Sequence, residues 1–508
     1  MTPKPIFILI VSVSAFLMGP RIVLAQSTTR STPVDESTVQ QKIDRLASAL
    51  DRAQQQVDEL RGELNALREE QRAQARAESV TTMTAVPAAA SDSTSATEEQ
   101  EMQAAEIRQQ QQVKVESTSK FPLRVTGLVL FNAIRNFGVV DEVDLPVSAL
   151  IRSAGTSHGS LAATMRQTWI GLAGTGPVLG GAHTSARVDM DFFGGVTGGV
   201  TSAPAGIVRF RTASIGADWE HDSLEARVDS PLISPLSPTS IATVAEPALA
   251  WSGNLWTWAP EVRYTHRFNL RTKYNLVLES GLRDAYLANA QVDQVVRAVS
   301  PAELSELPTF EGRIAFVDRT AQDHGAYGTD DATGLDLGVG GSFGQQNYGK
   351  GVLVNTWSLT GDWRFPLGRW LSISGEAYTG TGLGSLGGGA YRDVVQGTNP
   401  TTGVASTVGL DASGGWAQLS AVAGPRLQFH AAFGQDSGSG SELRSLTMAA
   451  PSNPVAFYAR SRTIFGNLIY RPWQSFTISP EYRFLQSWPI NGTFNVTHVF
   501  TISAGYQF

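Results

Sequence analysis

Residues 495–508 read NVTHVFTISAGYQF, and their alternation of side-chain types raises the question of which fold this segment belongs to. One set of alternate residues is largely apolar: Val496, His498, Phe500, Ile502, Ala504, Tyr506 and Phe508. The other set is small and mostly polar: Thr497, Val499, Thr501, Ser503, Gly505 and Gln507. A period of two places the two sets on opposite faces of a β-strand. Such a strand fits a soluble sheet packed on a core, and it fits a membrane barrel with its apolar face toward lipid.

The composition of the chain favours the second alternative. The 508 residues include 50 Gly, 22 Phe, 11 Trp and 11 Tyr, and only 17% are charged, against about 25% in average soluble domains. Beyond the N-terminus, no apolar stretch reaches the roughly 20 residues of a transmembrane helix. The net charge of −7 argues against nucleic acid as a partner. Cysteine is absent, so disulfides and Cys-based metal sites are excluded.

Residues 1–25 have the features of a cleavable secretory signal peptide. Lys4 precedes the apolar run Ile6–Met18, and small residues precede a cleavage site after Ala25. The run of about 13 residues is too short to span a bilayer as a helix, which needs roughly 20. The alternative, an uncleaved anchor, is disfavoured by Pro20 and Arg21, which interrupt any extension of the run.

Residues 38–72 predict an α-helical coiled coil. The a and d positions of four heptads carry Val39, Ile43, Leu46, Leu50, Ala53, Val57, Leu60, Leu64 and Leu67. Polar residues lie between them, and only a partner helix buries so narrow a seam, so we predict an oligomer. The alternative is a single amphipathic helix lying on another domain. Residues 73–119 lose the period and are predicted to be a linker.

The segment 120–508 is predicted to be a β-barrel because alternating patterns recur along it. We identify 16 strand candidates: 123–136, 164–175, 183–194, 206–219, 222–229, 258–268, 273–282, 310–318, 333–343, 352–365, 369–380, 414–423, 426–434, 459–470, 475–486 and 497–508. The fold class is therefore an all-β membrane barrel of about 16 antiparallel strands, preceded by an α-helical coiled coil.

The lengths of the connections distinguish a membrane barrel from a soluble sandwich. Several even-to-odd connections are tight, such as EHDS at 220–223 and PLGR at 366–369. Several odd-to-even connections are long, such as 137–163 and 381–413. Short turns on one rim and long loops on the other are typical of bacterial outer-membrane barrels. The exceptions are the long connection 319–332 and the short one 344–351, where one strand pair could be misplaced.

About 16 strands enclose a water-filled lumen, so the inward-facing charges are candidate pore-lining residues. These candidates are Arg187, Asp189, Asp191, Arg211, Arg227, Glu261, Arg263, Arg267, Arg313, Arg426, Glu481 and Arg483. Arginines clustered at a constriction would favour anions; the alternative is that each is a partner in a wall ion pair. The loop 230–260, with its prolines and its apolar anchors, is predicted to fold back into the lumen. The alternative is a lid on the rim.

Several short motifs resemble those of the DcaP-like trimeric porin family. They are TMRQTWIGLAG at 164–174, ARVDMDFFGG at 186–195, SGNLWTWAPEVRYTH at 252–266, ELPTFEGRIAF at 306–316 and NLIYRPWQSFTISPEYR at 467–483. The resemblance implies a homotrimer, an inward third loop and a preference for small anionic solutes such as dicarboxylates. It also implies that the barrel assembly machinery reads the terminal aromatic residue, Phe508.

The expected function is passive diffusion of small hydrophilic solutes through the outer membrane of a Gram-negative-type bacterium, with the coiled coil in the periplasm. One alternative is a structural or adhesive barrel tethered to the cell wall through the coiled coil. Another is a barrel enzyme, which would need a Ser-His pair on the lipid-facing wall, where His266 and His498 are the outward histidines. We expect no enzyme activity and no cofactor. We also expect no metal, because the seven histidines show no ligand spacing.

Overall fold

The computed structural model describes residues 114–115, 122–152, 155, 157–196, 206–270, 273–285, 298–318, 334–424, 426–448 and 458–508. The predicted signal peptide, coiled coil and most of the predicted linker lie outside these residues. No helix among the described residues is long and apolar enough to cross a membrane.

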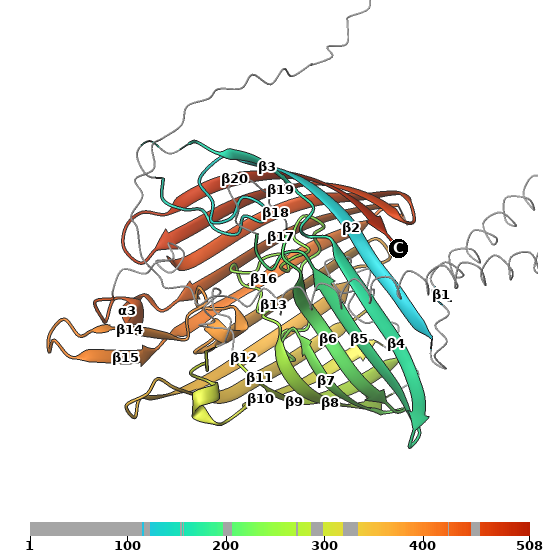
Figure 1. Ribbon diagram of the computed structural model, residues 1–508, viewed down its shortest axis with the longest axis horizontal. Coiled ribbons are helices and arrows are strands. Elements are labelled where there is room, and N and C mark those ends of the chain that lie inside the picture. The colour runs from blue at the N-terminus through green and yellow to red at the C-terminus, as the bar shows by residue number, and fades with distance from the viewer. Residues whose placement is uncertain are drawn as a thin grey trace, which may run out of the picture. The chain divides into compact units, whose positions relative to one another are not determined.

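The described strands form one antiparallel sheet that closes on itself (Figure 1). Its members are β1 (Lys114–Val115), β2 (Leu123–Asn136), β3 (Ser160–Thr164), β4 (Trp169–Leu179), β5 (Ala182–Asp191), β6 (Arg209–Asp218), β7 (Asp222–Asp229), β8 (Ala259–Asn269), β9 (Tyr274–Arg283), β10 (Thr309–Asp318), β11 (Asp336–Asn347), β12 (Leu353–Pro366), β13 (Leu371–Thr381), β16 (Asp411–Val422), β17 (Leu427–Gly438), β18 (Tyr458–Trp473), β19 (Phe476–Pro489) and β20 (Asn495–Gln507). A separate hairpin pairs β14 (Val394–Thr398) with β15 (Ala405–Gly409).

The wall of this sheet is a closed barrel of 16 strands. Both β3 and β4 pair with β2, so they are two pieces of one wall strand. The two-residue β1 pairs only with the start of β2. The barrel closes where β20 pairs with β2, and the amide of Gly127 donates to the carbonyl of Phe508. The prediction of a 16-strand antiparallel barrel is confirmed, and each of the 16 candidates overlaps a wall strand.

The connections divide the barrel into a long-loop rim and a short-turn rim. The turns 180–181, 219–221, 367–370, 423–426 and 474–475 lie on the short-turn rim, and the opposite rim carries connections such as 137–159, 230–258 and 382–410. The two exceptions noted in the sequence are real features of the chain. Because β11 and β12 pair in register with their neighbours, no strand pair is misplaced at 319–335 or 348–352.

The two faces of the wall differ as the alternation predicts. In β20 the inward side chains Thr497, Thr501 and Ser503 are buried, whereas Phe500 and Ile502 are exposed on the outside. The same division holds in β12, where Thr356, Ser358 and Thr360 are buried and Trp357 and Leu359 are exposed. The barrel therefore has a polar inner face and an apolar outer face, as a barrel in lipid requires.

Among the described residues, the long-loop rim also carries two 3₁₀ turns and one short helix. They are η2 (Glu303–Ser305), η3 (Gly384–Leu386) and α3 (Gly440–Leu443). The turn η3 belongs to the connection after β13, and the backbone of its last residue contacts the connection 230–258: the amide of Trp256 donates to the carbonyl of Leu386. The connections thus pack on one another as well as on the wall.

Candidate functional site: the constriction inside the barrel

The connection between β7 and β8, residues 230–258, lies inside the barrel. We call it the inward segment. Its apolar side chains Leu232, Ile233, Leu236, Ile241 and Leu255 are at most 2% exposed. Most residues of this segment are buried from solvent, whereas a loop lying over the rim would expose many of its residues. The prolines in SPLISPLSP fix φ near −65° and favour an extended path along the wall.

The first part of the inward segment is held by side chains of the wall. The Glu311 carboxylate of β10 accepts a hydrogen bond from the amide of Leu232 at 3.0 Å. Glu376 of β13 accepts one from Ser234 Oγ at 2.5 Å and one from the amide of Leu236 at 2.7 Å. Because a buried amide without a partner is costly, these wall acceptors determine where the segment lies.

The middle of the segment contacts wall strands farther along the barrel. Gln418 of β16 accepts from the amide of Thr239 at 2.7 Å, and Asn467 of β18 donates to the carbonyl of Thr239 at 2.8 Å. Glu481 of β19 accepts from Ser240 Oγ at 2.5 Å. The anchors therefore come from β10, β13, β16, β18 and β19, and the segment follows the inner wall around much of its circumference.

The next residues reach the wall beside β4 and β6. Gln167, in the bend between β3 and β4, donates to the carbonyl of Ala242 and accepts from the amide of Ala245. Arg211 of β6 donates to the carbonyl of Val244 at 2.7 Å, and Arg209 donates to that of Ala245 at 2.5 Å. Charged groups thus satisfy loop carbonyls as well as loop amides.

The return of the segment toward β8 needs unusual backbone geometry. Leu249 and Trp251 have φ values of 60° and 68°, in the left-handed region that costs a side-chain-bearing residue energy. Gly253 has a φ of 101°, and a Cβ on it would lie 2.2 Å from the carbonyl oxygen of Gly415. Ser252 Oγ lies 2.8 Å from Thr463 Oγ1. The tight fit against the wall holds this turn in place.

A second connection, residues 382–393, packs against the inward segment. Its Leu383 and Leu386 form one buried cluster with Leu232, Ile233 and Leu255. Asp436 of β17 accepts from the amides at 389 and 390. The ring of Tyr391 lies against that of Trp251 and its hydroxyl accepts a hydrogen bond from Trp256 Nε1. The candidate constriction therefore consists of two connections that stabilise each other.

The connection between β2 and β3, residues 137–159, also contacts the inward segment, and it places carboxyl groups there. Leu145 packs with Phe193 and with Ala245 of the segment. Burial raises the pKa of Asp141 to about 6, although the amides at 147 and 148 donate to it. Burial also raises the pKa of Glu246, on the segment, to about 7, with Arg209 opposing the shift and the carboxylates of Asp141 and Glu142 adding to it.

Most of the predicted pore-lining charges lie on the inner wall in ion pairs. The pairs are Arg187–Asp189, Arg211–Asp191, Arg227 with Glu225 and Asp229, Arg263–Glu261, Arg267–Asp218, Arg313 with Glu279, Asp336 and Asp362, and Arg483–Glu481. The remaining candidate, Arg426, lies in the exposed turn one residue before β17, at the short-turn rim. The contacts of the paired residues therefore fit the alternative that each is a partner in an ion pair of the wall. A role of these residues in conduction stays a prediction.

Sequence reasoning missed several anchors of the two connections, among them Glu376, Gln418, Asn467 and Asp436. The signal was present in the alternation: each occupies an inward position and is at most 6% exposed. From the sequence alone, an inward polar residue is interpreted as a wall residue in contact with water. Only the position of the connections inside the barrel shows that these four residues are their buried hydrogen-bond partners.

The two outward histidines have partners other than serine. His266 Nδ1 lies 2.6 Å from Asp222 Oδ1, and Tyr264 also donates to that carboxylate. His498 Nδ1 lies 2.6 Å from the hydroxyl of Tyr482. The hydrogen bonds of these histidines in the described part of the chain therefore form no Ser-His pair on the outer wall. Among the described residues, no group of three or more acidic or histidine side chains could hold a metal ion.

The chain matches no protein-family model and no curated protein. Among solved structures it is similar to the outer membrane channel DcaP of Acinetobacter baumannii, with 15% identity, a TM-score of 0.57, and coverage of 78% of this chain and 100% of that chain. It is also similar to the anion-selective porin from Comamonas acidovorans (12% identity, TM-score 0.43, 77% and 100% covered) and to Pseudomonas putida OprB (7%, 0.44, 76% and 94%). The similarity to the first structure confirms the expected resemblance at the level of the fold.

Proposed function

We propose that this chain is an outer-membrane porin through which small hydrophilic solutes diffuse passively. The observation that carries the proposal is a closed 16-strand barrel with a polar inner face, an apolar outer face and a fixed inward segment. A barrel of this size holds a water-filled lumen, and a segment held by wall side chains sets the size of what passes. The similarity of fold to an outer membrane channel supports the same role.

We propose further that the pore favours small anions, such as dicarboxylates. In several ion pairs of the inner wall the arginine is the more exposed partner: Arg187 is 39% exposed and Asp189 is 1% exposed. Arg209 is 24% exposed, whereas its partner Asp191 is fully buried. A solute beside these pairs therefore meets guanidinium groups in front of the carboxylates that neutralise them, and the local potential is positive at short range.

The assembly we propose is a homotrimer in the outer membrane of a Gram-negative-type bacterium. Residues 1–25 would direct export, the coiled coil 38–72 would lie in the periplasm, and the barrel assembly machinery would insert the barrel. An enzyme role is not proposed, because the polar groups of the inner wall described above bind the connections and each other rather than forming an open catalytic group.

Conductance in planar bilayers tests the proposal. Purified protein should give discrete conductance steps, and under a salt gradient the reversal potential should show anion preference. Arg187→Gln should lower that preference, whereas Arg426→Gln, at the exposed turn, is the matched control and should leave it unchanged. A folded barrel that gives no conductance steps would refute the porin proposal. Steps without anion preference would refute only the selectivity.

A further inference from the structure

The outer wall of β17, β18 and β19 carries a pair of arginines near the long-loop rim. Arg460 and Arg462 belong to the outward-facing set of β18, whose inward-facing set includes the buried Ser461 and Thr463. The guanidinium groups of Arg460 and Arg462 lie 5.7 Å and 5.2 Å from a ring centroid of Trp488 on β19. The two cations are therefore close neighbours on the outside of the barrel.

Among the residues that the structure describes, both arginines donate hydrogen bonds only to uncharged acceptors. Arg460 Nε donates to Ser437 Oγ at 2.8 Å. Arg462 donates through Nε and Nη2 to Gln435 Oε1, at 3.0 Å and 2.6 Å. Glu442, the acidic residue nearest to them in the sequence, accepts from the backbone amide at 411 instead. The arginines therefore keep their positive charge and several N–H groups for a ligand outside the barrel.

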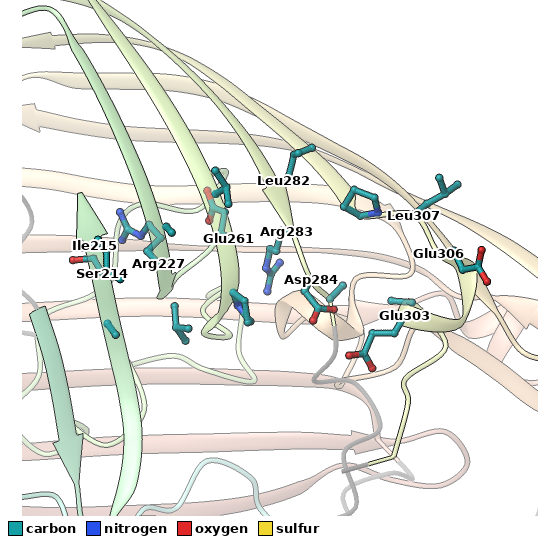
Figure 2. A pocket seen from close by; sticks show the side chains of 18 residues that line it. Ser214, Ile215, Arg227, Glu261, Leu282, Arg283, Asp284, Glu303, Glu306 and Leu307 are labelled. Atoms are coloured by element: carbon teal, nitrogen blue, oxygen red, sulfur yellow. The ribbon is translucent and has the colours of Figure 1, made fainter. Parts of the chain in front are cut away.

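The sequence on this side of the barrel is poor in acidic residues. Residues 443–508 contain one of them, Glu481, which faces the lumen and is 1% exposed. The long-loop rim beside β9 and β10 differs, because Figure 2 shows the carboxylates of Asp284, Glu303 and Glu306 there. The positive charge is therefore a local property of the wall at β17 to β19 and not of the whole rim.

The two arginines lie at the edge of the apolar band of the wall. Toward the short-turn rim, the outward side chains that follow them on β18 are Ile464, Gly466, Leu468 and Tyr470. From Ile464 to Trp473, at the end of the strand, β18 rises about 21 Å at about 3.3 Å per residue and a tilt of about 45°, close to the apolar band of about 25 Å. Aromatic girdles flank that band, and here Trp473 and Trp488 stand at its two edges. The guanidinium groups therefore lie at the level of lipid headgroups, on the long-loop side that faces outward in outer-membrane barrels.

A groove lies in the apolar wall on the same strands. It has a volume of about 440 Å³, and the outward residues Ala431, Gly466, Leu468 and Tyr482 belong to its lining. Gly466 pairs across the sheet with Ala431 on one side and with Tyr482 on the other, so small residues leave a hollow beside larger ones. Gly466 is four residues from Arg462 on the same face of β18. The wall thus joins a cationic site at headgroup level to an apolar groove at the level of acyl chains.

We propose that this surface binds a phosphorylated glycolipid of the outer leaflet, with its phosphate groups on Arg460 and Arg462 and an acyl chain in the groove. Guanidinium groups bind phosphate oxygens through charge-assisted, often bidentate hydrogen bonds. A pair of cations fits a glycolipid that carries two phosphates better than a phospholipid that carries one. The inference rests on the proposed location in the outer membrane and does not depend on conduction.

Native mass spectrometry of the full-length protein in detergent tests the cationic site, with diphosphoryl lipid A as the probe. R460Q/R462Q should bind lipid A roughly tenfold more weakly than the natural protein, since each exposed ionic contact contributes a factor of a few. The matched control R369Q/R426Q removes two exposed arginines from the short-turn rim and should bind like the natural protein. Heat-dependent gel mobility checks that both variants are folded barrels. Equal binding by the two double variants would overturn the proposal.

The choice of lipid gives a second measurement, which needs no variant. The natural protein should bind diphosphoryl lipid A more tightly than monophosphoryl lipid A with the same acyl chains, and more tightly than phosphatidylglycerol. Equal binding of the three lipids would contradict recognition of a phosphorylated glycolipid by the paired arginines.

The groove is tested separately by Gly466→Leu. A Cβ at this position would come no closer than 3.7 Å to its nearest neighbour, the carbonyl oxygen of His430, so the fold accommodates the change while the side chain fills the groove. Binding of both forms of lipid A should weaken, and unchanged binding would overturn the role of the groove. A barrel that binds lipid A as described but gives no conductance steps would refute only the porin proposal. A conducting barrel whose lipid binding ignores phosphate would refute only this one.

Discussion

The strongest test of the constriction is the removal of its best-connected anchor, Glu376. This carboxylate accepts hydrogen bonds from Ser234 Oγ at 2.5 Å, from the amide of Leu236 at 2.7 Å and from Trp416 Nε1 at 3.2 Å. Only the bonds from Ser234 and Leu236 hold the segment, since Trp416 belongs to β16. At about 1–1.5 kcal/mol for each of these two net hydrogen bonds, Glu376→Ala should weaken the seated segment by about 2–3 kcal/mol. With about 1.4 kcal/mol per factor of ten, the ratio of seated to unseated segment falls roughly 30- to 140-fold.

Single-channel recording measures this change directly. The Ala variant should spend more time in a state of larger conductance, because an unseated segment widens the narrowest cross-section. Glu376→Gln keeps the volume and an acceptor for the amide of Leu236, so it should lie near the natural protein. Glu225→Ala is the matched control, since Glu225 pairs with Arg227 and holds no part of the segment. If Glu376→Ala and Glu225→Ala give the same records, Glu376 does not hold a constriction.

Other parts of the chain give four further measurable outcomes. Deleting the core of the inward segment, 235–252, should raise single-channel conductance, and an unchanged value would contradict its place as the narrowest point. Replacing both Arg263 and Arg267 with glutamate should move the reversal potential toward cations; if it does not move, these arginines act only as wall partners. Because the pKa of Glu246 is raised to about 7 from 4.5, the seated segment binds more protons between these values, so its stability falls as pH rises from 4.5 to 7 and is level above. The larger conductance state should therefore be more frequent at pH 7 than at pH 5, and Glu246→Gln should remove that difference. Deleting 38–72 should weaken the oligomer in native gels without preventing barrel folding, whose backbone bonds are internal; loss of the folded barrel would show that the coiled coil does more than join chains.

The strands were predictable because a membrane barrel imposes the same alternation on each of them. The candidate 222–229 coincides with β7, and 123–136 coincides with β2. The candidate 164–175 was less accurate, since the wall strand there is broken into β3 and β4 by a bend at 165–168. Gln167 in that bend points inward and binds the segment. Such a local break depends on a tertiary contact, so the alternation of residues along the strand does not predict it.

The constriction was predictable in outline and not in detail. The prolines and apolar residues of 230–260 indicated a folded-back loop, and its burial agrees with that interpretation. Its partners could not be predicted: Leu236 and Glu376 are 140 residues apart, and Ser240 and Glu481 are 241 apart. The path of the loop depends on the curvature of the closed wall, which no local pattern records.

By itself, the sequence determined the strand period, the two faces of the wall and the division of long and short connections between the rims, because each follows from chain geometry within a few residues. Only the tertiary structure decided which inward side chains meet water and which meet the segment. The physical reason is closure: once β20 pairs with β2, residues remote in sequence share one inner surface, and buried amides there must find acceptors.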